Sequence, residues 1–179
     1  MRARRPDSIF LIGYRCTGKT TVGKLLAAEL GWQWTDADQV LEQRHGRTIA
    51  QLFAEGGEAG FRNLEATLLK ELCTSRGQVV ATGGGVILRP ENRAQLKAAG
   101  QVVWLRADPD TIWRRLQMDP ATAERRPNLT TGGRAEIEEL LRVREPLYRA
   151  CAHFCVDTAG RNPEEVVRLI VAGLPPPRE

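Results

Sequence analysis

The chain has 179 residues, of which 42% are hydrophobic and 27% charged, the balance of an ordinary globular protein. This length suits one hydrophobic core, so we expect a single domain over residues 1–179. The net charge of +4 is spread along the chain without a stripe of basic and aromatic residues. That pattern argues against a nucleic-acid partner and suits a pocket for small anions.

Membrane and export signals are not recognisable in the sequence. No apolar run approaches the roughly 18–20 residues that a bilayer-spanning helix needs. The basic first residues lead directly into a strand-like run, without the apolar region and cleavage site of a secretory signal. We therefore expect a cytoplasmic protein with no membrane partner.

Predicted strands and helices alternate along the chain. Short apolar runs predict five strands, at residues 8–12, 33–36, 78–82, 101–105 and 154–157. Apolar residues at helical spacing predict helices at residues 20–30, 38–45, 48–54, 57–74, 91–99, from 109 onward, 134–150 and 163–172. The alternation predicts an α/β fold whose mostly parallel sheet is covered on both faces and binds ligands at the carboxyl ends of its strands.

Residues 117–133 interrupt this rhythm. The segment is polar, rich in Thr, Arg and Gly, and contains two prolines. Since connections of this length inside a compact domain are often functional, we expect a mobile lid here. No internal repeat and no domain linker is visible.

A glycine-rich turn joins the first predicted strand to the first helix. It fits the pattern G-x-x-x-x-G-K-[ST], here Gly13-Tyr14-Arg15-Cys16-Thr17-Gly18-Lys19-Thr20. Successive backbone N–H groups of such a loop point at phosphate oxygens, and the helix N-terminus favours the same anion. Lys19 is expected to reach the β- and γ-phosphates, and the Thr20 hydroxyl to ligate Mg²⁺. The motif predicts ATP and Mg²⁺, and the chain is short enough for a small kinase.

Two aspartates follow the second predicted strand. Asp36 is placed to hold Mg²⁺, directly or through water, and Asp38 to take the proton of an acceptor hydroxyl. The simpler alternative is that Asp36 caps the next helix. The third strand ends in Thr82 rather than in an acid, and Asp108 before Pro109 is better explained as a helix cap. We therefore place the metal carboxylate at Asp36.

Two further features suit the binding of an anionic acceptor. Gly83–Gly85 follow the third strand, where backbone without side chains can approach a ligand closely, although a simple turn explains them equally well. Arg62 offers a planar fork that matches a carboxylate. Considered alone, Arg62 is better explained as the partner of a neighbouring acid such as Glu65 or Glu58.

Taken in order, these pieces resemble the shikimate kinase family over nearly the whole chain. The matching segments are the turn at 13–20, Asp36-Ala37-Asp38, Gly57-Glu58-Ala59-Gly60-Phe61-Arg62-Asn63-Leu64-Glu65, Gly83-Gly84-Gly85, Arg126-Pro127 and Arg144-Glu145-Pro146-Leu147-Tyr148. Each segment except the first is weak evidence for the family when taken alone, but the whole set in this order is specific for it. The resemblance implies a three-layer P-loop kinase fold with a five-stranded parallel sheet, and a monomer that phosphorylates shikimate on the path to chorismate and the aromatic amino acids.

The resemblance also implies roles for individual residues. Shikimate would be bound within the helical segment 37–65 and beyond it, by Asp38, Arg62, Gly83, Gly84, Gly85 and Arg144. The nucleotide would be bound by Gly13, Cys16, Thr17, Gly18, Lys19, Thr20, Thr21, Arg115, Arg126, Arg161 and Pro163. Thr20 and Asp36 would hold the metal, and Lys19, Asp38 and Arg126 would be catalytic. Arg125 is the neighbouring alternative for the lid arginine.

Three rival functions remain at the level of sequence. A gluconate kinase would share the phosphate-binding turn but differ in the acceptor arginines. A binding module would keep the turn and lose catalysis, which the presence of Lys19, Thr20, Asp36, Asp38 and Arg126 disfavours. A nucleoside monophosphate kinase fits the Arg62 and Gly83–Gly85 segments less well.

Overall fold

A computed structural model describes residues 7–119 and 132–176. Its sheet has five strands, all paired in parallel, in the order β2-β3-β1-β4-β5. The strands are β1 (Ser8–Ile12), β2 (Gln33–Asp36), β3 (Gln78–Ala81), β4 (Gln101–Arg106) and β5 (Phe154–Asp157). The predicted α/β fold with a five-stranded parallel sheet is confirmed.

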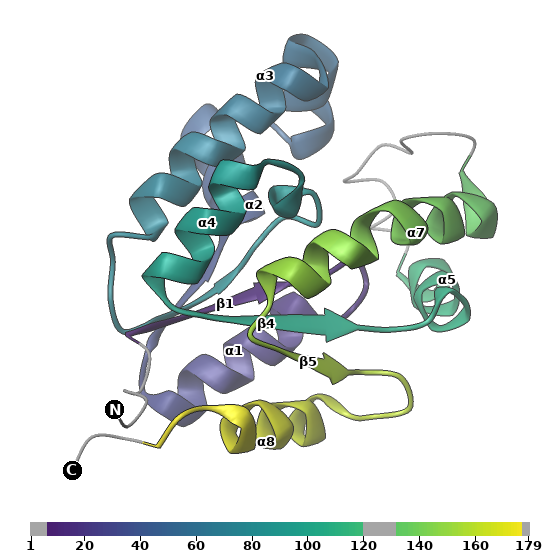
Figure 1. The fold of residues 1–179 in the computed structure, drawn as a ribbon. Helices are drawn as coiled ribbons and strands as arrows, with labels where there is room; N and C mark the ends of the chain where they lie inside the picture. The colour runs from purple at the N-terminus through teal and green to yellow at the C-terminus, as the bar shows by residue number, and fades with distance from the viewer. Residues whose placement is uncertain (1–6, 120–131, 177–179) are drawn as a thin grey trace.

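Helices cover both faces of this sheet (Figure 1). The helices are α1 (Lys19–Leu30), α2 (Ala37–His45), α3 (Ile49–Leu72), α4 (Pro90–Ala99), α5 (Pro109–Met118), α7 (Gly133–Cys151) and α8 (Pro163–Gly173), with a 3₁₀ turn η1 (Val86–Leu88). No helix within residues 7–119 and 132–176 is long and apolar enough to cross a membrane.

The central strand β1 shows why the sheet lies inside the molecule. All five of its residues are buried, so its side chains enter the core on both faces. Ile9 and Leu11 pack in the cluster that includes residues of α1 and α8, whereas Phe10 and Ile12 pack in the cluster that includes residues of α4 and α7. Alternation along one strand therefore joins the two outer layers through the sheet.

Most helices begin at local signals. Thr48 and Asn162 form capping boxes at the starts of α3 and α8, and Asp108 caps α5 ahead of Pro109 as the sequence predicts. The predicted helices at 48–54 and 57–74 lie end to end within α3, which is interrupted at Gly57 (φ 64°, ψ −178°). A residue with positive φ and extended ψ cannot continue a helix, and glycine tolerates it best.

The topology puts ligand-binding loops at one edge of the sheet. Strand β1 lies between β3 and β4. The chain runs from β1 to β2 on one side of the sheet's centre and from β4 to β5 on the other, so the direction of the connections reverses beside β1. All five strands are parallel, and their carboxyl ends therefore share one edge. The loops after β1, β2 and β3 carry many of the residues predicted to bind ligands, and α3, α5, α7 and the loop after β5 carry others.

Candidate active site

The turn after β1, residues 13–20, is called the phosphate loop below. Gly13 has a φ of 144°, and a Cβ added there would lie 2.3 Å from the Leu105 carbonyl oxygen, so only glycine fits. Gly18 has a φ of 95° and directly precedes α1. Lys19, only 7% exposed, donates from Nζ to the carbonyl oxygens of Gly13 (2.8 Å) and Tyr14 (2.7 Å). The loop is thus closed around its own lysine at the positive end of α1.

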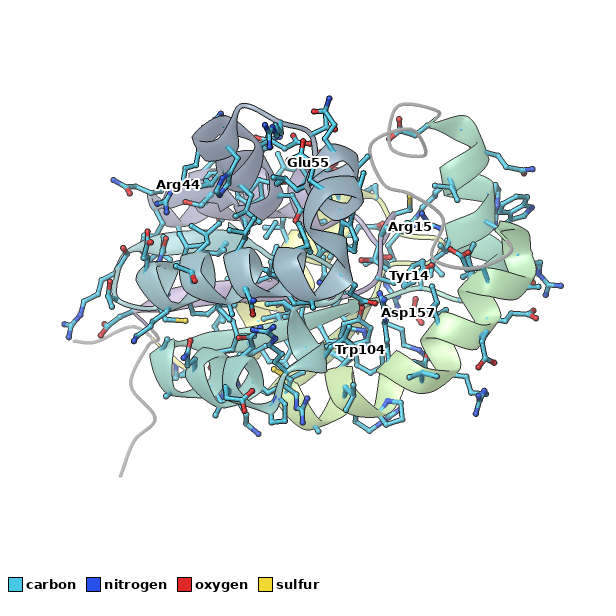
Figure 2. The ribbon with its side chains drawn as sticks, turned by 90° about the horizontal axis from the view of Figure 1, so that it is seen from above. Tyr14, Arg15, Arg44, Glu55, Trp104 and Asp157 are labelled. Carbon is cyan, nitrogen blue, oxygen red and sulfur yellow. The ribbon has the colours of Figure 1, made fainter. Side chains whose placement is uncertain are left out.

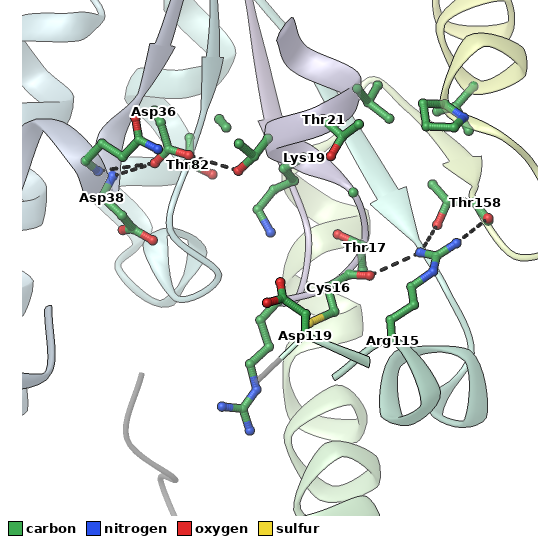
Figure 3. A pocket seen from close by; sticks show the side chains of 18 of the residues that line it. Cys16, Thr17, Lys19, Thr21, Asp36, Asp38, Thr82, Arg115, Asp119 and Thr158 are labelled. Carbon is green, nitrogen blue, oxygen red and sulfur yellow. Dashed lines mark hydrogen bonds between the residues drawn. The ribbon is translucent and has the colours of Figure 1, made fainter. Parts of the chain in front are cut away.

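A cavity of about 610 Å³, the larger cavity below, opens beside this loop (Figure 3). Among the residues predicted to bind the nucleotide or metal, those that line it are Cys16, Thr17, Gly18, Lys19, Thr20, Thr21, Asp36, Arg115, Arg161 and Pro163. Gly13 does not line it and acts through its backbone. Arg126 and its neighbour Arg125 fall outside the described residues, as does most of the predicted lid.

Asp36 makes separate contacts through its two carboxylate oxygens. Oδ1 accepts hydrogen bonds from the backbone N–H groups of Asp38 (3.1 Å) and Gln39 (3.3 Å), capping α2. Oδ2 accepts a hydrogen bond from Thr20 Oγ1 at 2.9 Å. The capping role is therefore present, and it leaves the other oxygen beside the hydroxyl of Thr20. Hydroxyl and carboxylate oxygens are the ligands that Mg²⁺ prefers, so this pair fits the predicted metal site.

Arg115 connects three segments at the rim of the larger cavity. Its Nη1 donates to the Cys16 carbonyl oxygen (3.1 Å) and to Thr158 Oγ1 (3.0 Å), and its Nη2 donates to the Thr158 carbonyl oxygen (2.7 Å). Figure 3 shows these bonds running from α5 to the phosphate loop and to the loop after β5. Sequence reasoning found Arg115 but not this bracing role.

A second, smaller cavity of about 60 Å³ lies at the same edge of the sheet. It is lined by every residue predicted to bind the acceptor, namely Asp38, Arg62, Gly83, Gly84, Gly85 and Arg144. Arg62 also pairs with Glu65 (2.7 Å) and, more loosely, with Glu58 (3.6 Å). The ion pair expected as the simpler explanation of Arg62 is thus present, and the same guanidinium borders the smaller cavity.

Glu65 is a residue of this cavity that sequence reasoning named only as an ion-pair partner. Its Oε2 accepts the hydrogen bond from Arg62 Nη1, whereas its Oε1 is buried and has no hydrogen-bond partner within the described residues. Burial raises the pKa of this carboxyl, and the positive charge of Arg62 opposes the rise. Its position three residues after Arg62 on α3 is the signal that marks it.

Gly83 and Gly85 sit where side chains would collide with these charged groups. A Cβ at Gly83 would lie 2.5 Å from Glu65 Oε1, and a Cβ at Gly85 would lie 2.3 Å from Arg62 Nη2. Tyr148, fully buried on α7, donates from its hydroxyl to the Gly84 carbonyl oxygen. The glycine segment is therefore a packed wall of the smaller cavity and more than a turn.

The two cavities share a boundary. Arg15, Asp38 and Ile49 line both of them. On one side stand the phosphate loop and Lys19, and on the other stand two arginines able to bind an anion. This arrangement can bring a bound phosphate donor and a bound anionic acceptor together across Asp38.

Comparisons with known proteins agree with this geometry. A family model described as shikimate kinase matches residues 15–175. A shikimate kinase of Rhodopirellula baltica is 41% identical over 172 residues, covering 96% of this chain and 92% of its own length. One from Thermodesulfovibrio yellowstonii is 44% identical over 165 residues, covering 92% of each.

A solved structure supports the same conclusion. The shikimate kinase from Acinetobacter baumannii in complex with shikimate superposes with a TM-score of 0.86 at 36% identity, covering 92% of this chain and 90% of that one. The sequence matches and this superposition each cover 92% or more of the chain. The family model takes in every residue that lines the larger cavity and all but Tyr14 of those that line the smaller one. The chain belongs to the shikimate kinase family.

Proposed function

We propose that this chain transfers the γ-phosphate of ATP to the 3-hydroxyl of shikimate, forming shikimate 3-phosphate and ADP on the path to chorismate. One observation carries the proposal: Asp38 borders both the larger cavity beside the phosphate loop and the smaller cavity lined by Arg62 and Arg144. A carboxylate at that boundary can meet the acceptor hydroxyl while the phosphate lies opposite.

The larger cavity is the proposed nucleotide site. The loop N–H groups and Lys19 neutralise the phosphate charge, and Arg115, Arg161 and Pro163 line the part of the cavity left for the adenosine. Thr20 and Asp36 would hold Mg²⁺, whose charge would offset that of the β- and γ-phosphates. Both side chains already lie in contact, so the site needs little rearrangement.

The smaller cavity is the proposed shikimate site. Arg62 and Arg144 would bind the substrate carboxylate, and the backbone of Gly83–Gly85 would contact its ring. The 3-hydroxyl oxygen forms the new bond to the γ-phosphorus as the bond from that phosphorus to the β–γ bridging oxygen breaks. Asp38 takes the hydroxyl proton, and the electron pair leaves on ADP. Positioning and charge neutralisation supply most of such catalysis.

We propose roles for the rest of the chain as well. Residues 1–179 form one domain, residues 37–65 carry much of the acceptor site, and residues 117–133 form a lid from which Arg126 reaches the transferring phosphate. The enzyme acts as a cytoplasmic monomer. The exclusion of water by such a lid would limit hydrolysis of ATP.

A coupled ADP-release assay tests the reaction. The purified protein is given ATP and Mg²⁺ with shikimate or with gluconate, and shikimate-dependent turnover is the expected result. Turnover with gluconate and none with shikimate would mean that Arg62, Arg144 and Asp38 do not have the proposed roles in binding the acceptor. Nucleotide binding without turnover on either substrate would favour a binding module.

Two variants then separate the cavities. Lys19→Ala should lower kcat by at least about 100-fold, because the developing charge on the γ-phosphate loses its cation. Arg62→Ala should raise the KM for shikimate far more than the KM for ATP. Equal effects on both KM values would move Arg62 out of the acceptor site.

A further inference from the structure

Arg15 and Glu136 form a buried ion pair that no predicted role explains. Arg15 Nη2 lies 3.1 Å from Glu136 Oε1, and the two side chains are 8% and 0% exposed. The partners are 121 residues apart in sequence, one in the phosphate loop and the other in the first turn of α7. The pair thus joins two elements that are far apart in the sequence.

Stability alone is a poor reason for such a pair. Removing two charges from water costs several kcal/mol per ion in rough terms, and their attraction often only offsets that cost. Arg15 Nε is moreover buried with no hydrogen-bond partner within the described residues, which adds to the cost. Because burying this pair costs free energy, its presence points toward a role in positioning another side chain.

Each partner has a second contact that extends the connection. Glu136 Oε2 accepts a hydrogen bond from the backbone N–H of Gly132 (3.0 Å), which fixes the start of α7. Arg15 lies with its guanidinium carbon 5.6 Å from the centre of the Tyr14 ring. Figure 2 shows Tyr14 and Arg15 between the helices α2 and α3 on one side and α7 on the other.

Tyr14 carries the connection to the acceptor side. The guanidinium of Arg144 lies 5.9 Å from the same ring, within the range of a cation–π contact. Arg144 follows Glu136 on α7 by about two helical turns, so both side chains lie on one face of that helix. The Tyr14 ring also packs in one apolar cluster with Ile137 and Leu141 of α7. The phosphate loop therefore contacts α7 through the ion pair of Arg15 with Glu136 and through the ring of Tyr14.

The backbone of Tyr14 completes the path toward the nucleotide. Its carbonyl oxygen accepts hydrogen bonds from Lys19 Nζ (2.7 Å) and from Thr17 Oγ1 (2.8 Å). The residue whose ring touches Arg144 is therefore also fixed by two residues of the larger cavity. A shift of α7 relative to the phosphate loop would therefore change the position of Arg144 relative to Lys19.

We propose that Arg15 and Glu136 are positioning residues. Their ion pair ties α7 to the phosphate loop and so holds Arg144 at the correct place in the smaller cavity. This inference rests on the proposed function, because it takes Arg144 as a ligand of shikimate. Neither Arg15 nor Glu136 needs to touch the reacting atoms.

The first test is Glu136→Gln. Arg15 and the Gly132 N–H donate to different oxygens of Glu136, and glutamine replaces one of these oxygens with an NH₂ group. One of the two donors would then face another donor. We expect the KM for shikimate to rise about tenfold, a typical size for coupling between sites, while the KM for ATP changes less than about threefold. Glu139→Gln, which breaks an exposed pair with Arg142 on the same helix, is the matched control and should leave both KM values unchanged.

A double variant separates positioning from mere stability. Arg15→Met with Glu136→Gln leaves no lone buried charge, so its Tm should recover toward that of the wild type relative to Glu136→Gln alone. The KM for shikimate should nevertheless stay raised. Recovery of the KM together with the Tm would overturn the inference and make the pair purely structural.

Failure of the inference is distinguishable from failure of the proposed function. If the wild type phosphorylates shikimate and Glu136→Gln keeps its KM for shikimate within twofold, the positioning role is wrong and the function stands. If the wild type does not phosphorylate shikimate at all, the proposed function is wrong and the inference falls with it.

Discussion

Cys16 holds a backbone conformation that side chains rarely adopt. Its φ is 61°, the only positive value at a non-glycine position among the described residues. A left-handed residue other than glycine costs roughly 1–2 kcal/mol. The larger cavity is therefore bordered by a locally strained loop, whose conformation the surrounding contacts maintain.

Cys16→Gly should relieve this strain. We expect the free energy of unfolding to rise by about 1 kcal/mol or somewhat less, since glycine also adds freedom to the unfolded chain. Urea unfolding measures the change. Cys16→Ala keeps the strain and serves as the control, and an equal gain in that variant would contradict the explanation.

Glu65 should make stability depend on pH in an unusual direction. Burial raises the pKa of its carboxyl above the unfolded value, so its contribution to stability is present below the unfolded pKa, about 4.3, and is lost as the pH rises through the folded pKa. The wild type should therefore lose stability relative to Glu65→Gln as the pH is raised from 4 upward. Chemical unfolding of both proteins at a series of pH values measures the difference.

Glu139 provides the opposite case on an exposed surface. A hydrogen bond from Arg142 lowers the pKa of its carboxyl, so its contribution is present above the unfolded pKa and is lost as the pH falls. The wild type should therefore become slightly more stable relative to Glu139→Gln as the pH rises. The same trend in both variants would refute the assignment for Glu65.

At the scale of one element, the start of α2 combines a helix cap with the proposed metal site. Asp36→Asn keeps an oxygen that can cap the helix, so the free energy of unfolding should change by less than about 0.5 kcal/mol. Loss of the negative charge beside Thr20 should raise the Mg²⁺ concentration needed for half-maximal activity by about tenfold. A magnesium titration of the ADP-release assay measures this.

Asp108→Asn is the matched control for that experiment. Asp108 caps α5 through Thr111 in the same way but does not line the larger cavity. Its replacement should leave the magnesium requirement unchanged. A similar shift in both variants would mean that capping, rather than metal binding, explains the effect of Asp36.

The elements themselves were largely predictable because their signals are local. Strand runs, the Asp108-Pro109 helix start and the glycine-rich turn act through neighbouring residues, and the structure places each near its predicted bounds. The two helices predicted on either side of Gly57 correspond to the two parts of α3, which meet at a break in the helix. The direction of the second part was not predictable, because it depends on packing against distant residues such as Leu41 of α2.

At the scale of the whole molecule, Arg115 should stabilise the fold as well as the nucleotide site. Arg115→Ala removes three hydrogen bonds between α5, the phosphate loop and the loop after β5. We expect unfolding free energy to fall by about 1–3 kcal/mol and the KM for ATP to rise more than the KM for shikimate. Thermal unfolding and steady-state kinetics measure these effects.

Arg114→Ala controls for the loss of a positive charge on the same helix. Arg114 is exposed, and among the described residues it makes one long contact, 3.5 Å to Thr111 Oγ1. It should leave both the stability and the KM values near those of the wild type. Equal losses in both variants would contradict the bracing role of Arg115.

Contacts of this long-range kind are what sequence reasoning missed. The residues predicted for the acceptor site were carried by motifs, and they do line one cavity, although their roles stay predictions until tested. The pairing of Arg15 with Glu136 and of Arg115 with Thr158 joins positions far apart in sequence. The order of the strands likewise depends on the packing of the whole chain, which no local pattern reports.

The break at Gly57 divides the wall of the acceptor cavity into two parts. Before it lie Ile49 and Phe53, which are apolar. After it lie Phe61 and the two charged residues Arg62 and Glu65. No atom lies within 4 Å of a Cβ added at Gly57, so backbone conformation rather than space requires glycine there. All the charged residues that α3 contributes to this cavity thus follow the break. Substitutions within residues 49–56 can therefore change the shape of the smaller cavity while Arg62 and Glu65 stay in place, which makes this segment the first choice for redesigning substrate preference.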